Sequence, residues 1–367
     1  MSHKINQSFQ RVLIMAGGTG GHVFPGLALA HYLRTKEIEI HWLGTQQGVE
    51  SQLVPEAGIT LHCISIGGLR GKGMMTLLQA PFKLLIALFQ SCRILYQVKP
   101  DVVIGFGGFA SGPGGLATWL MRYPLVIHEQ NAKVGFTNKV LAFFSKKILE
   151  GFPAAFKSRS KVVVIGNPVR QEIENLYPPI ERMSARQSPC HLLVLGGSLG
   201  AQAINEILPK ALLHLSFTER PEILHQTGKK HFDVTKQAYQ TRDLPVNLVP
   251  FIGDMAAAYQ WADIVLCRAG ALTVAELCTV GLGAIFVPYP HAVDDHQTAN
   301  AQYMVNHQAA VCIQQSDLSE KGLAEIISNL ASSPAKRLRM AQAAYQLRFV
   351  DVSEKIFAIL CALANEH

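Results

Sequence analysis

Short apolar runs alternate with longer stretches of helical length through the first half of the chain. The helix-length stretches include Pro25–Thr35, Met74–Gln97 and Gly135–Phe144. The apolar runs, which end in Gly or polar residues, are Arg11–Ala16, Ile38–Leu43, Leu61–Ile66, Val102–Gly105 and Leu125–Glu129. Continuous apolar runs are typical of strands buried on both faces. The alternation therefore predicts a parallel sheet with ligands at the carboxyl ends of its strands.

The second half of the chain starts the same pattern again. Its helix-length stretches include Ala201–His214. Its apolar runs are His191–Leu195, Glu222–Gln226, Val246–Val249, Asp263–Cys267 and Ala284–Val287. This repetition predicts a second parallel sheet.

The two halves also resemble each other locally. VLIMAGGTGGH (Val12–His22) and HLLVLGGSLGA (His191–Ala201) each read as a strand, two glycines, a hydroxyl residue and a helix. Chance remains an alternative, because glycine is favoured at any strand-to-helix turn. We expect two Rossmann-like domains, residues 1–167 and 168–347, with a ligand cleft between them. An amphipathic terminal helix at Val352–Leu363, within residues 348–367, is expected to pack back on the first domain.

Composition narrows the class of protein. The 367 residues are 49% hydrophobic and only 16% charged, which excludes a disordered chain. Seven scattered cysteines without a CxxC pair favour reduced thiols over a disulfide framework or a zinc site. The N-terminus lacks an apolar signal core, and the most apolar stretch, Met74–Phe89, is interrupted by Gln79, Pro81 and Lys83. We therefore expect a soluble protein.

Charge is distributed unevenly along the chain. Residues 1–170 carry 18 Lys and Arg against 7 Asp and Glu, a balance of +11, whereas residues 171–367 carry 15 against 19, a balance of −4. From Ala57 to His128 the sole acidic residue is Asp101. The first half is therefore expected to meet something anionic, such as a phosphate-rich ligand or a membrane surface. A nucleic-acid partner is not expected, because no basic motif is interleaved with aromatic residues.

Three glycine-rich loops follow predicted strands. GGTGGH (Gly17–His22) and GGSLG (Gly196–Gly200) lie where a strand turns into a helix, a place suited to holding phosphate. A dinucleotide fingerprint does not fit, because the sixth residue from Gly18 is Val23 and no acidic residue ends the next strand. A Walker loop is also absent from the sequence. The third loop, GFGGFASGPGG (Gly105–Gly115), predicts close backbone approach to a ligand or another domain, with a flexible surface loop as the alternative.

Candidate chemistry is open at three places when the residues are considered alone. His22 suits a general base near neutral pH, or it only hydrogen-bonds its loop. Thr273-Val-Ala-Glu276 fits a helix capping box, or its carboxylate binds a ribose diol. The cluster His291, Asp294, Asp295 and His296 could suggest a metal, but a solvated loop is the preferred interpretation and no DxD motif occurs.

Eight segments, in chain order, resemble the signature segments of the MurG family of N-acetylglucosaminyltransferases. They are GGTGGHVFPGLALA, GLRGKG, GGFASGPGG, HEQN, GNPVR, GGSLGA, CRAGALTVAE and DDHQTANA. The resemblance covers almost the whole chain. It implies the GT-B glycosyltransferase fold and a hexosyltransferase that needs neither metal nor other cofactor. The implied reaction transfers N-acetylglucosamine (GlcNAc) from UDP-GlcNAc, with inversion, to the 4-hydroxyl of N-acetylmuramic acid (MurNAc) in lipid I, giving lipid II for peptidoglycan.

The resemblance also implies roles for individual residues. His22 is implied as the general base, Ile252 as the reader of uracil through its backbone, and Glu276 as the ribose ligand. The implied substrate-binding residues are Thr19, Gly20, Gly21, Asn131, Arg170, Ser198, Ile252, Ala271, Leu272, Thr273, Val274, Ala275, Glu276 and Gln297. Beside Gln297 this chain departs from the family pattern, with Asp295-His296 where some relatives carry Arg-Gln.

The implied location is the cytoplasmic face of the bacterial inner membrane, with peripheral attachment to its anionic surface. Five cations accompany an apolar series that exceeds what one buried helix face requires, and they are Arg70, Lys72, Lys83, Arg93 and Lys99. Most such helices bury their apolar face, which is the alternative. Another GT-B glycosyltransferase acting on a membrane lipid acceptor is the alternative function. A non-catalytic sugar-nucleotide-binding module is less favoured, since both His22 and Arg170 are present.

Overall fold

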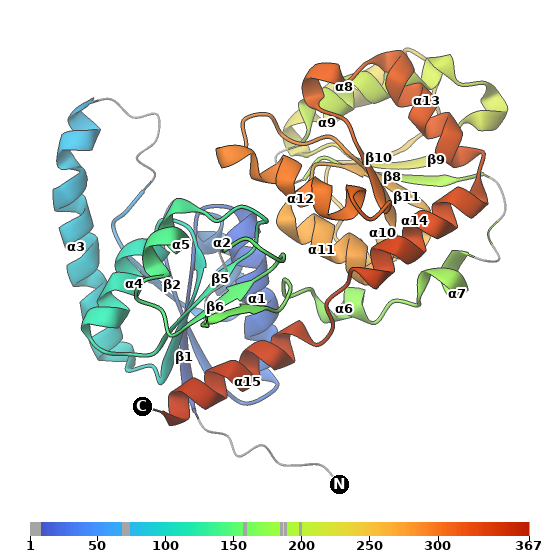
Figure 1. The fold of residues 1–367 in the computed structure, drawn as a ribbon. Helices are drawn as coiled ribbons and strands as arrows, with labels where there is room; N and C mark the ends of the chain where they lie inside the picture. The colour runs from blue at the N-terminus through green and yellow to red at the C-terminus, as the bar shows by residue number, and fades with distance from the viewer. Residues whose placement is uncertain are drawn as a thin grey trace, which may run out of the picture. The chain divides into compact units, whose positions relative to one another are not determined.

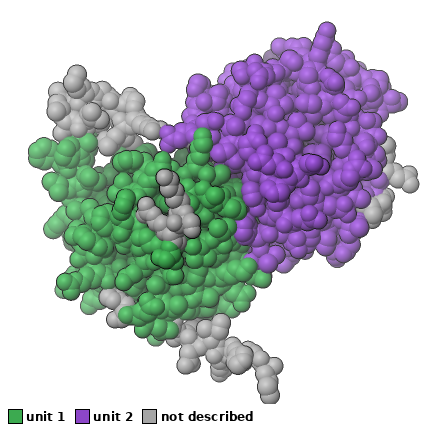
Figure 2. Space-filling view, in the orientation of Figure 1, with its two compact units in different colours: residues 1–169, 351–367 green, residues 170–350 purple. Residues whose placement is uncertain are grey.

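The chain divides into two compact units. The computed structural model describes residues 9–67, 74–156, 160–183, 186, 189–197 and 200–366, without the side chains of 74–79 and 293. Unit 1 comprises residues 1–169 and 351–367, and unit 2 comprises residues 170–350 (Figure 2). The segment GLRGKG (Gly68–Gly73) and the predicted phosphate ligand Ser198 lie outside the described residues.

Unit 1 is built on a parallel sheet of seven strands. Their order is β3-β2-β1-β4-β5-β6-β7 (Figure 1). The strands are β1 (Arg11–Ala16), β2 (Glu39–Gly44), β3 (Thr60–Cys63), β4 (Val102–Gly107), β5 (Leu125–Glu129), β6 (Lys147–Glu150) and β7 (Val162–Val164). The strand order reverses between β1 and β4, and ligands bind at such switch points in open αβ sheets. The sequence pattern missed β6 and β7, because both are short and β6 begins with a lysine.

Helices cover both faces of this sheet, as Figure 1 shows. They are α1 (Gly20–Arg34), α2 (Glu50–Glu56), α3 (Met74–Val98), α4 (Ser111–Leu120), α5 (Phe136–Leu141) and α15 (Val352–Asn365). The C-terminal helix α15 packs on α1, where the ring of Phe357 lies 6.2 Å from that of Tyr32 and 5.9 Å from that of Phe9. No helix among the described residues is long and apolar enough to cross a membrane.

Helix α1 starts earlier than the sequence pattern suggested. The pattern placed its start at Pro25, a residue favoured in the first turn, but the helix begins at Gly20 and Pro25 lies inside it. The carbonyl oxygen of Thr19 accepts from the backbone N–H groups of His22 and Val23, at 3.1 and 3.3 Å. The additional turn places His22 at the N-terminus of a helix of 15 residues.

Unit 2 has a second parallel sheet, in the order β10-β9-β8-β11-β12-β13. Its strands are β8 (His191–Leu195), β9 (Glu222–Gln226), β10 (Asn247–Val249), β11 (Ile264–Cys267), β12 (Gly283–Phe286) and β13 (Ala310–Cys312). Its α-helices are α6 (Gln171–Glu174), α7 (Pro179–Met183), α8 (Gln202–Ala211), α9 (Phe232–Gln240), α10 (Met255–Trp261), α11 (Ala271–Val280), α12 (His296–Val305), α13 (Glu320–Ala331) and α14 (Pro334–Gln346). The expectation of two parallel αβ sheets is confirmed.

Each unit has its own apolar core, because strands in the middle of a parallel sheet are covered on both faces. In unit 1 the side chains of Leu13 and Met15 on β1 pack with Val103 on β4 and Ile127 on β5. In unit 2 the corresponding core joins Leu192 and Val194 on β8 with Leu266 on β11 and Ile285 on β12, among others. The strand ends outside these cores carry the candidate site residues.

Candidate active site

His22 is held by two oxygen acceptors at the end of β4 and β5. Its ring Nδ1 lies 2.9 Å from the carbonyl oxygen of Phe106 and 3.0 Å from Oε1 of Gln130. A carbonyl oxygen can only accept, so Nδ1 carries the hydrogen and Nε2 of the neutral ring keeps its lone pair. These contacts join the histidine to β4 and to Gln130 and not to the glycine loop. This tautomer is the one that the predicted general base requires, since its Nε2 can accept a proton.

The loop before His22 rests on a carboxylate that sequence reasoning missed. Glu50 is fully buried, and it accepts from the N–H of Gly18 at 2.9 Å and from the N–H and hydroxyl of Thr45 at 3.0 and 2.7 Å. A Cβ added at Gly17 would lie 2.6 Å from Oε1 of Glu50. The glycine is therefore needed for close approach to this carboxylate. Glu50 could not be identified from the sequence, because its partners are separated from it by up to 32 residues.

The third glycine loop is ordered by contact with the first. Strand β4 extends to Gly107, and α4 begins at Ser111. Gly107 and Gly108 have φ of +98° and +83°, and a Cβ on Gly108 would lie 2.0 Å from the carbonyl oxygen of Gly17. The close approach predicted for this loop is therefore found, but to the first glycine loop of the same unit. The glycines permit close packing of the loops after β1 and β4 within unit 1.

Asn131 is oriented by the residue two positions before it. Oε1 of Glu129 accepts from the backbone N–H of Asn131 at 3.0 Å and from its amide at 3.2 Å. The other oxygen of Glu129 accepts from the N–H of Gly135 and the amide of Asn138, both at 3.0 Å. Since Gln130 contacts His22, unit 1 brings the predicted residues His22 and Asn131 to the ends of adjacent elements. Thr19 and Gly21 lie exposed at the start of α1.

In unit 2, Glu276 and Arg170 meet through their side chains. Oε1 of Glu276 lies 3.3 Å from the Arg170 guanidinium, and Oε2 accepts from the hydroxyl of Tyr259 at 2.8 Å. The Glu276 side chain is 16% exposed. Burial raises the pKa of this carboxyl, while Arg170 and Tyr259 act in the opposite direction. A carboxylate with two donors and one accessible edge can still accept from a diol.

The capping-box interpretation of Thr273 and Glu276 is wrong. The N-cap of α11 is Gly270, so Thr273 lies within the first turn and Glu276 in the second. The first turn of α11, which includes Ala271, Leu272 and Thr273, contains no acidic residue and has no side-chain cap. Helix N-termini of this kind attract phosphate.

Two predicted α11 residues next to this turn have different surroundings. The side chain of Val274 is fully buried, and its N–H donates to the carbonyl of Gly270 at 3.0 Å. Ala275 is partly buried. Val274 therefore supports the helix, and it offers a ligand neither a side chain nor an N–H group.

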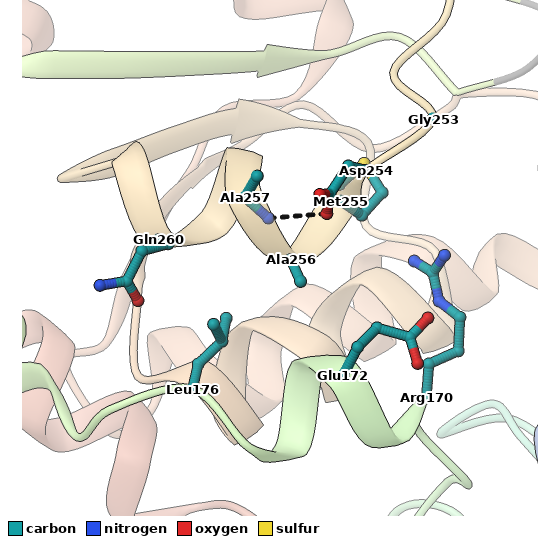
Figure 3. A pocket seen from close by; sticks show the side chains of 9 residues that line it. All are labelled: Arg170, Glu172, Leu176, Gly253, Asp254, Met255, Ala256, Ala257 and Gln260. Carbon is teal, nitrogen blue, oxygen red and sulfur yellow. Dashed lines mark hydrogen bonds between the residues drawn. The ribbon is translucent and has the colours of Figure 1, made fainter.

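A cavity of about 500 Å³ adjoins Arg170. Its lining comes from α6 and the residues on either side of it, and from α10 with the loop that leads into it. Figure 3 shows the residues: Arg170, Glu172, Leu176, Gly253, Asp254, Met255, Ala256, Ala257 and Gln260. Asp254 caps α10 by accepting from the N–H of Ala257 at 2.9 Å (Figure 3). Next to the cavity lining, Ile252 is buried, and its N–H donates to Oε1 of Gln226 at 2.9 Å. The predicted uracil contact therefore requires the carbonyl of Ile252 or displacement of Gln226.

Gln297 lies at the start of α12, near the end of β12. Its Oε1 accepts from the N–H of Tyr289 at 3.0 Å. Arg268 braces the same segment by donating to the carbonyls of Val287 and Pro288, at 2.9 and 3.0 Å. Among the residues that the structure describes, no group of three or more His, Cys, Asp or Glu could hold a metal ion. Metal independence remains a prediction about the reaction.

Comparison with known proteins defines the class. The N-terminal domain model of glycosyltransferase family 28 matches residues 12–150, and the C-terminal domain model matches residues 191–356. A solved structure, Acinetobacter baumannii MurG, superposes with a TM-score of 0.83 at 40% identity, over 96% of this chain and 99% of that one. Both family 28 domains, together with the two parallel αβ sheets and the match to MurG, make the protein a glycosyltransferase of the GT-B fold.

Two curated relatives resemble the chain over nearly its whole length. Both are named UDP-N-acetylglucosamine--N-acetylmuramyl-(pentapeptide) pyrophosphoryl-undecaprenol N-acetylglucosamine transferase. The Nitrosococcus oceani protein is 52% identical over 94% of this chain and 96% of its own length. The Marinobacter nauticus protein is 48% identical over 97% of this chain and 98% of its own. The chain belongs to the MurG family within glycosyltransferase family 28, which confirms the resemblance inferred from its segments.

Proposed function

We propose that the chain transfers GlcNAc from UDP-GlcNAc to the 4-hydroxyl of MurNAc in lipid I, giving lipid II for peptidoglycan synthesis. The observation that carries this proposal is the near full-length identity to relatives named for these substrates. The parallel sheets and the family domains alone support only a glycosyltransferase, because one fold hosts many acceptors.

The proposed reaction is a single displacement at the anomeric carbon of GlcNAc. Nε2 of His22 takes the proton of the acceptor hydroxyl while that oxygen bonds to the anomeric carbon. The bond from this carbon to the UDP oxygen breaks, UDP leaves with the electron pair, and the configuration inverts. The orientation of the His22 ring, with Nδ1 bound to the Phe106 carbonyl, supports this role.

In the proposed reaction, unit 2 binds the sugar nucleotide. The first turn of α11 and Arg170 would neutralise the developing charge on the diphosphate, and Glu276 would hold the ribose. Ser198 and Gln297 would contact phosphate and sugar, as in the family. In unit 1, the loop with Thr19, Gly20 and Gly21 would bind the phosphates of donor and acceptor, and Asn131 would contact the donor.

We propose that unit 1 also attaches the enzyme to the cytoplasmic face of the inner membrane. Helix α3 packs on α4, and α4 packs on α5. Large apolar side chains on these helices and just after α5 are exposed, and they are Phe82, Leu85, Phe89, Trp119, Leu120, Phe136 and Phe143. The cations Lys83, Arg93 and Lys99 are exposed on α3 and just after it. Apolar residues beside cations favour an anionic lipid surface.

An acceptor panel tests the proposed reaction. The purified chain would be incubated with UDP-[14C]GlcNAc and either a short-chain lipid I analogue or diacylglycerol, and labelled product would be separated by chromatography. We expect label in the lipid I analogue only. Transfer to diacylglycerol instead would support the alternative, a GT-B enzyme acting on another membrane lipid.

A further inference from the structure

A chain of hydrogen bonds runs from His22 into the core of unit 1. Nδ1 of His22 lies 3.0 Å from Oε1 of Gln130, and Nε2 of Gln130 lies 3.1 Å from Nδ1 of His128. Nε2 of His128 lies 2.9 Å from the carbonyl oxygen of Gly166. Nothing in the proposed reaction yet uses Gln130 or His128.

Backbone carbonyls determine the direction of every bond in this chain, because they can only accept. The amide nitrogen of Gln130 also lies 3.1 Å from the carbonyl of His128, so this end of the amide is the NH2 group. The opposite end is then the oxygen, and it must accept from Nδ1–H of His22. At the far end, the carbonyl of Gly166 requires a hydrogen on Nε2 of His128, which leaves Nδ1 of the neutral ring to accept from Gln130.

Burial of Gln130 and His128 keeps the directions of these hydrogen bonds fixed. Gln130 is 1% exposed and His128 is 0% exposed. Complete burial lowers the pKa of His128 to about 4, so its ring is neutral at pH 7 and Nδ1 remains an acceptor. The ring of His128 also packs against Phe106, with centroids 5.2 Å apart. The donor and acceptor ends of the Gln130 amide are therefore set by buried groups that do not titrate near neutral pH.

We propose that Gln130 is a positioning residue that holds His22 in the tautomer with hydrogen on Nδ1, and that His128 anchors Gln130. This inference rests on the proposed role of His22 as the base. Histidine in water favours the other tautomer, whose Nε2 carries the hydrogen and cannot accept a proton. The side-chain oxygen of Gln130 and the carbonyl oxygen of Phe106 would both repel an Nδ1 that carries no hydrogen. The hydrogen therefore stays on Nδ1, and Nε2 presents its lone pair to the acceptor hydroxyl.

In the family segment HEQN (His128–Asn131), alternate residues have different roles. His128 and Gln130 support His22, while Glu129 accepts from the backbone and amide of Asn131. His128 and Glu129 are the last two residues of β5, where successive side chains point to opposite faces, and Gln130 and Asn131 directly follow the strand. One segment therefore supports the base from one side and the predicted donor contact from the other.

The first test reads the tautomer directly. Long-range ¹H–¹⁵N spectra of protein labelled at histidine nitrogens distinguish a bare ring nitrogen from a protonated one, and the His22→Ala variant assigns the His22 signals. We expect wild-type His22 with hydrogen on Nδ1. Gln130→Met, which keeps the side-chain length, should increase the Nε2–H form. Gln130→Glu restores an acceptor oxygen toward His22 but turns its second oxygen toward the acceptors of His128, so it should reverse that increase only in part. A wild-type ring with hydrogen on Nε2 would overturn the inference without any variant.

The second test measures turnover of a soluble lipid I analogue by the same variants. One lost hydrogen bond is expected to lower the kcat of Gln130→Met by about 3- to 10-fold, with an unchanged KM for UDP-GlcNAc. Gln130→Glu should turn over faster than Gln130→Met. Gln90→Met is the matched control, because that amide bonds the backbone and hydroxyl of Ser65 and should retain wild-type kcat. Thermal melting and UDP binding confirm that each variant is folded.

The two readouts must change together. A changed tautomer with wild-type kcat, or a lower kcat with an unchanged tautomer, overturns the positioning role. The proposed reaction is tested separately by His22→Ala. If that variant loses turnover while Gln130→Met does not, the inference fails and the base stands. If His22→Ala retains turnover, the base is wrong whatever the tautomer.

Discussion

A histidine can act as a base only when the ring nitrogen that faces the substrate carries no hydrogen. The hydrogen-bond partners of His22 determine which of its two nitrogens carries the hydrogen. The carbonyl of Phe106 and the amide of Gln130 both face Nδ1. Sequence reasoning identified His22 from its residue type and its place after a glycine loop. The partners lie 84 and 108 residues away, so no local pattern could reveal them.

Removing the ring of His22 should mainly affect the chemical step. We expect His22→Ala to lower kcat by about 10²- to 10⁴-fold, the usual contribution of a general base, and to leave UDP affinity unchanged. Steady-state kinetics with a soluble acceptor and calorimetry with UDP measure the two quantities. A near-normal kcat in His22→Ala would contradict the assignment.

Glu276 should contribute to UDP binding through its carboxylate. Loss of a charged acceptor for the ribose diol should weaken UDP binding by roughly 10- to 100-fold in Glu276→Ala. This variant should also lose stability, because Arg170 and the hydroxyl of Tyr259 lose their acceptor. Tyr259→Phe is the matched control, since it removes one of these bonds and keeps the carboxylate. Equal losses of UDP affinity in both variants, measured by calorimetry, would argue against a direct ribose contact.

At the scale of the helix, exposure separates two apolar faces of α3, one exposed and one buried. The helix-length stretch Met74–Gln97 predicted a long helix, and the structure has one at Met74–Val98. Phe82 and Phe89 are 70% and 73% exposed, whereas Ala87 and Leu95 are buried. The excess of apolar residues is visible in the sequence. Which of them face solvent depends on how α3 packs against α4.

Charge reversal on this helix and at Lys72, which precedes it in the sequence, should release the protein from lipid. Each cation near an anionic surface contributes about 1 kcal/mol. Replacing Lys72, Lys83 and Arg93 together with Glu should therefore abolish sedimentation with anionic vesicles and spare turnover of a soluble acceptor. Wild-type binding should also weaken with added salt.

A matched control carries the same charge change on unit 2, where Lys236, Lys321 and Lys336 are exposed. Their triple replacement with Glu should leave vesicle binding intact. Unchanged binding in the α3 variant would place the membrane face elsewhere. Equal loss of soluble-acceptor turnover would mean that these cations support the fold or the active site.

For the whole molecule, catalysis is expected to need groups from both sheets and no metal ion. The negative charge on the UDP leaving group can be neutralised by the N-terminus of α11 and by Arg170. Transfer to the soluble lipid I analogue should therefore continue in excess EDTA. A loss of turnover that Mg²⁺ or Mn²⁺ restores would contradict this expectation.

Acidification should destabilise both units, because each buries a neutral histidine. Burial lowers the pKa of His128 in unit 1 to about 4 and that of His225 in unit 2 to about 3. Below the unfolded value of 6.5 the unfolded chain takes up a proton that the folded chain does not. Stability therefore falls as the pH decreases, by about 2 kcal/mol per histidine between pH 7 and pH 5.

Hydrogen exchange of peptides from β4 and β11 would measure the two units separately at these pH values. In His225→Gln the pH-dependent loss in unit 2 should shrink by about 2 kcal/mol, while unit 1 keeps its own. An unchanged pH dependence of unit 2 in this variant would show that His225 does not cause it.

The sequence by itself determined the two parallel sheets, the glycine loops at their strand ends and the family. These features follow from local rules, namely the length of apolar runs and the conformations that only glycine adopts. The tertiary structure decided the partners: Glu50 beneath the first glycine loop, Gln130 and His128 behind His22, and Tyr259 beside Glu276. It also rejected the capping box, because the true start of α11 depends on where β11 ends. A buried hydrogen bond joins residues that the fold brings together, and that pairing leaves no trace in residue spacing.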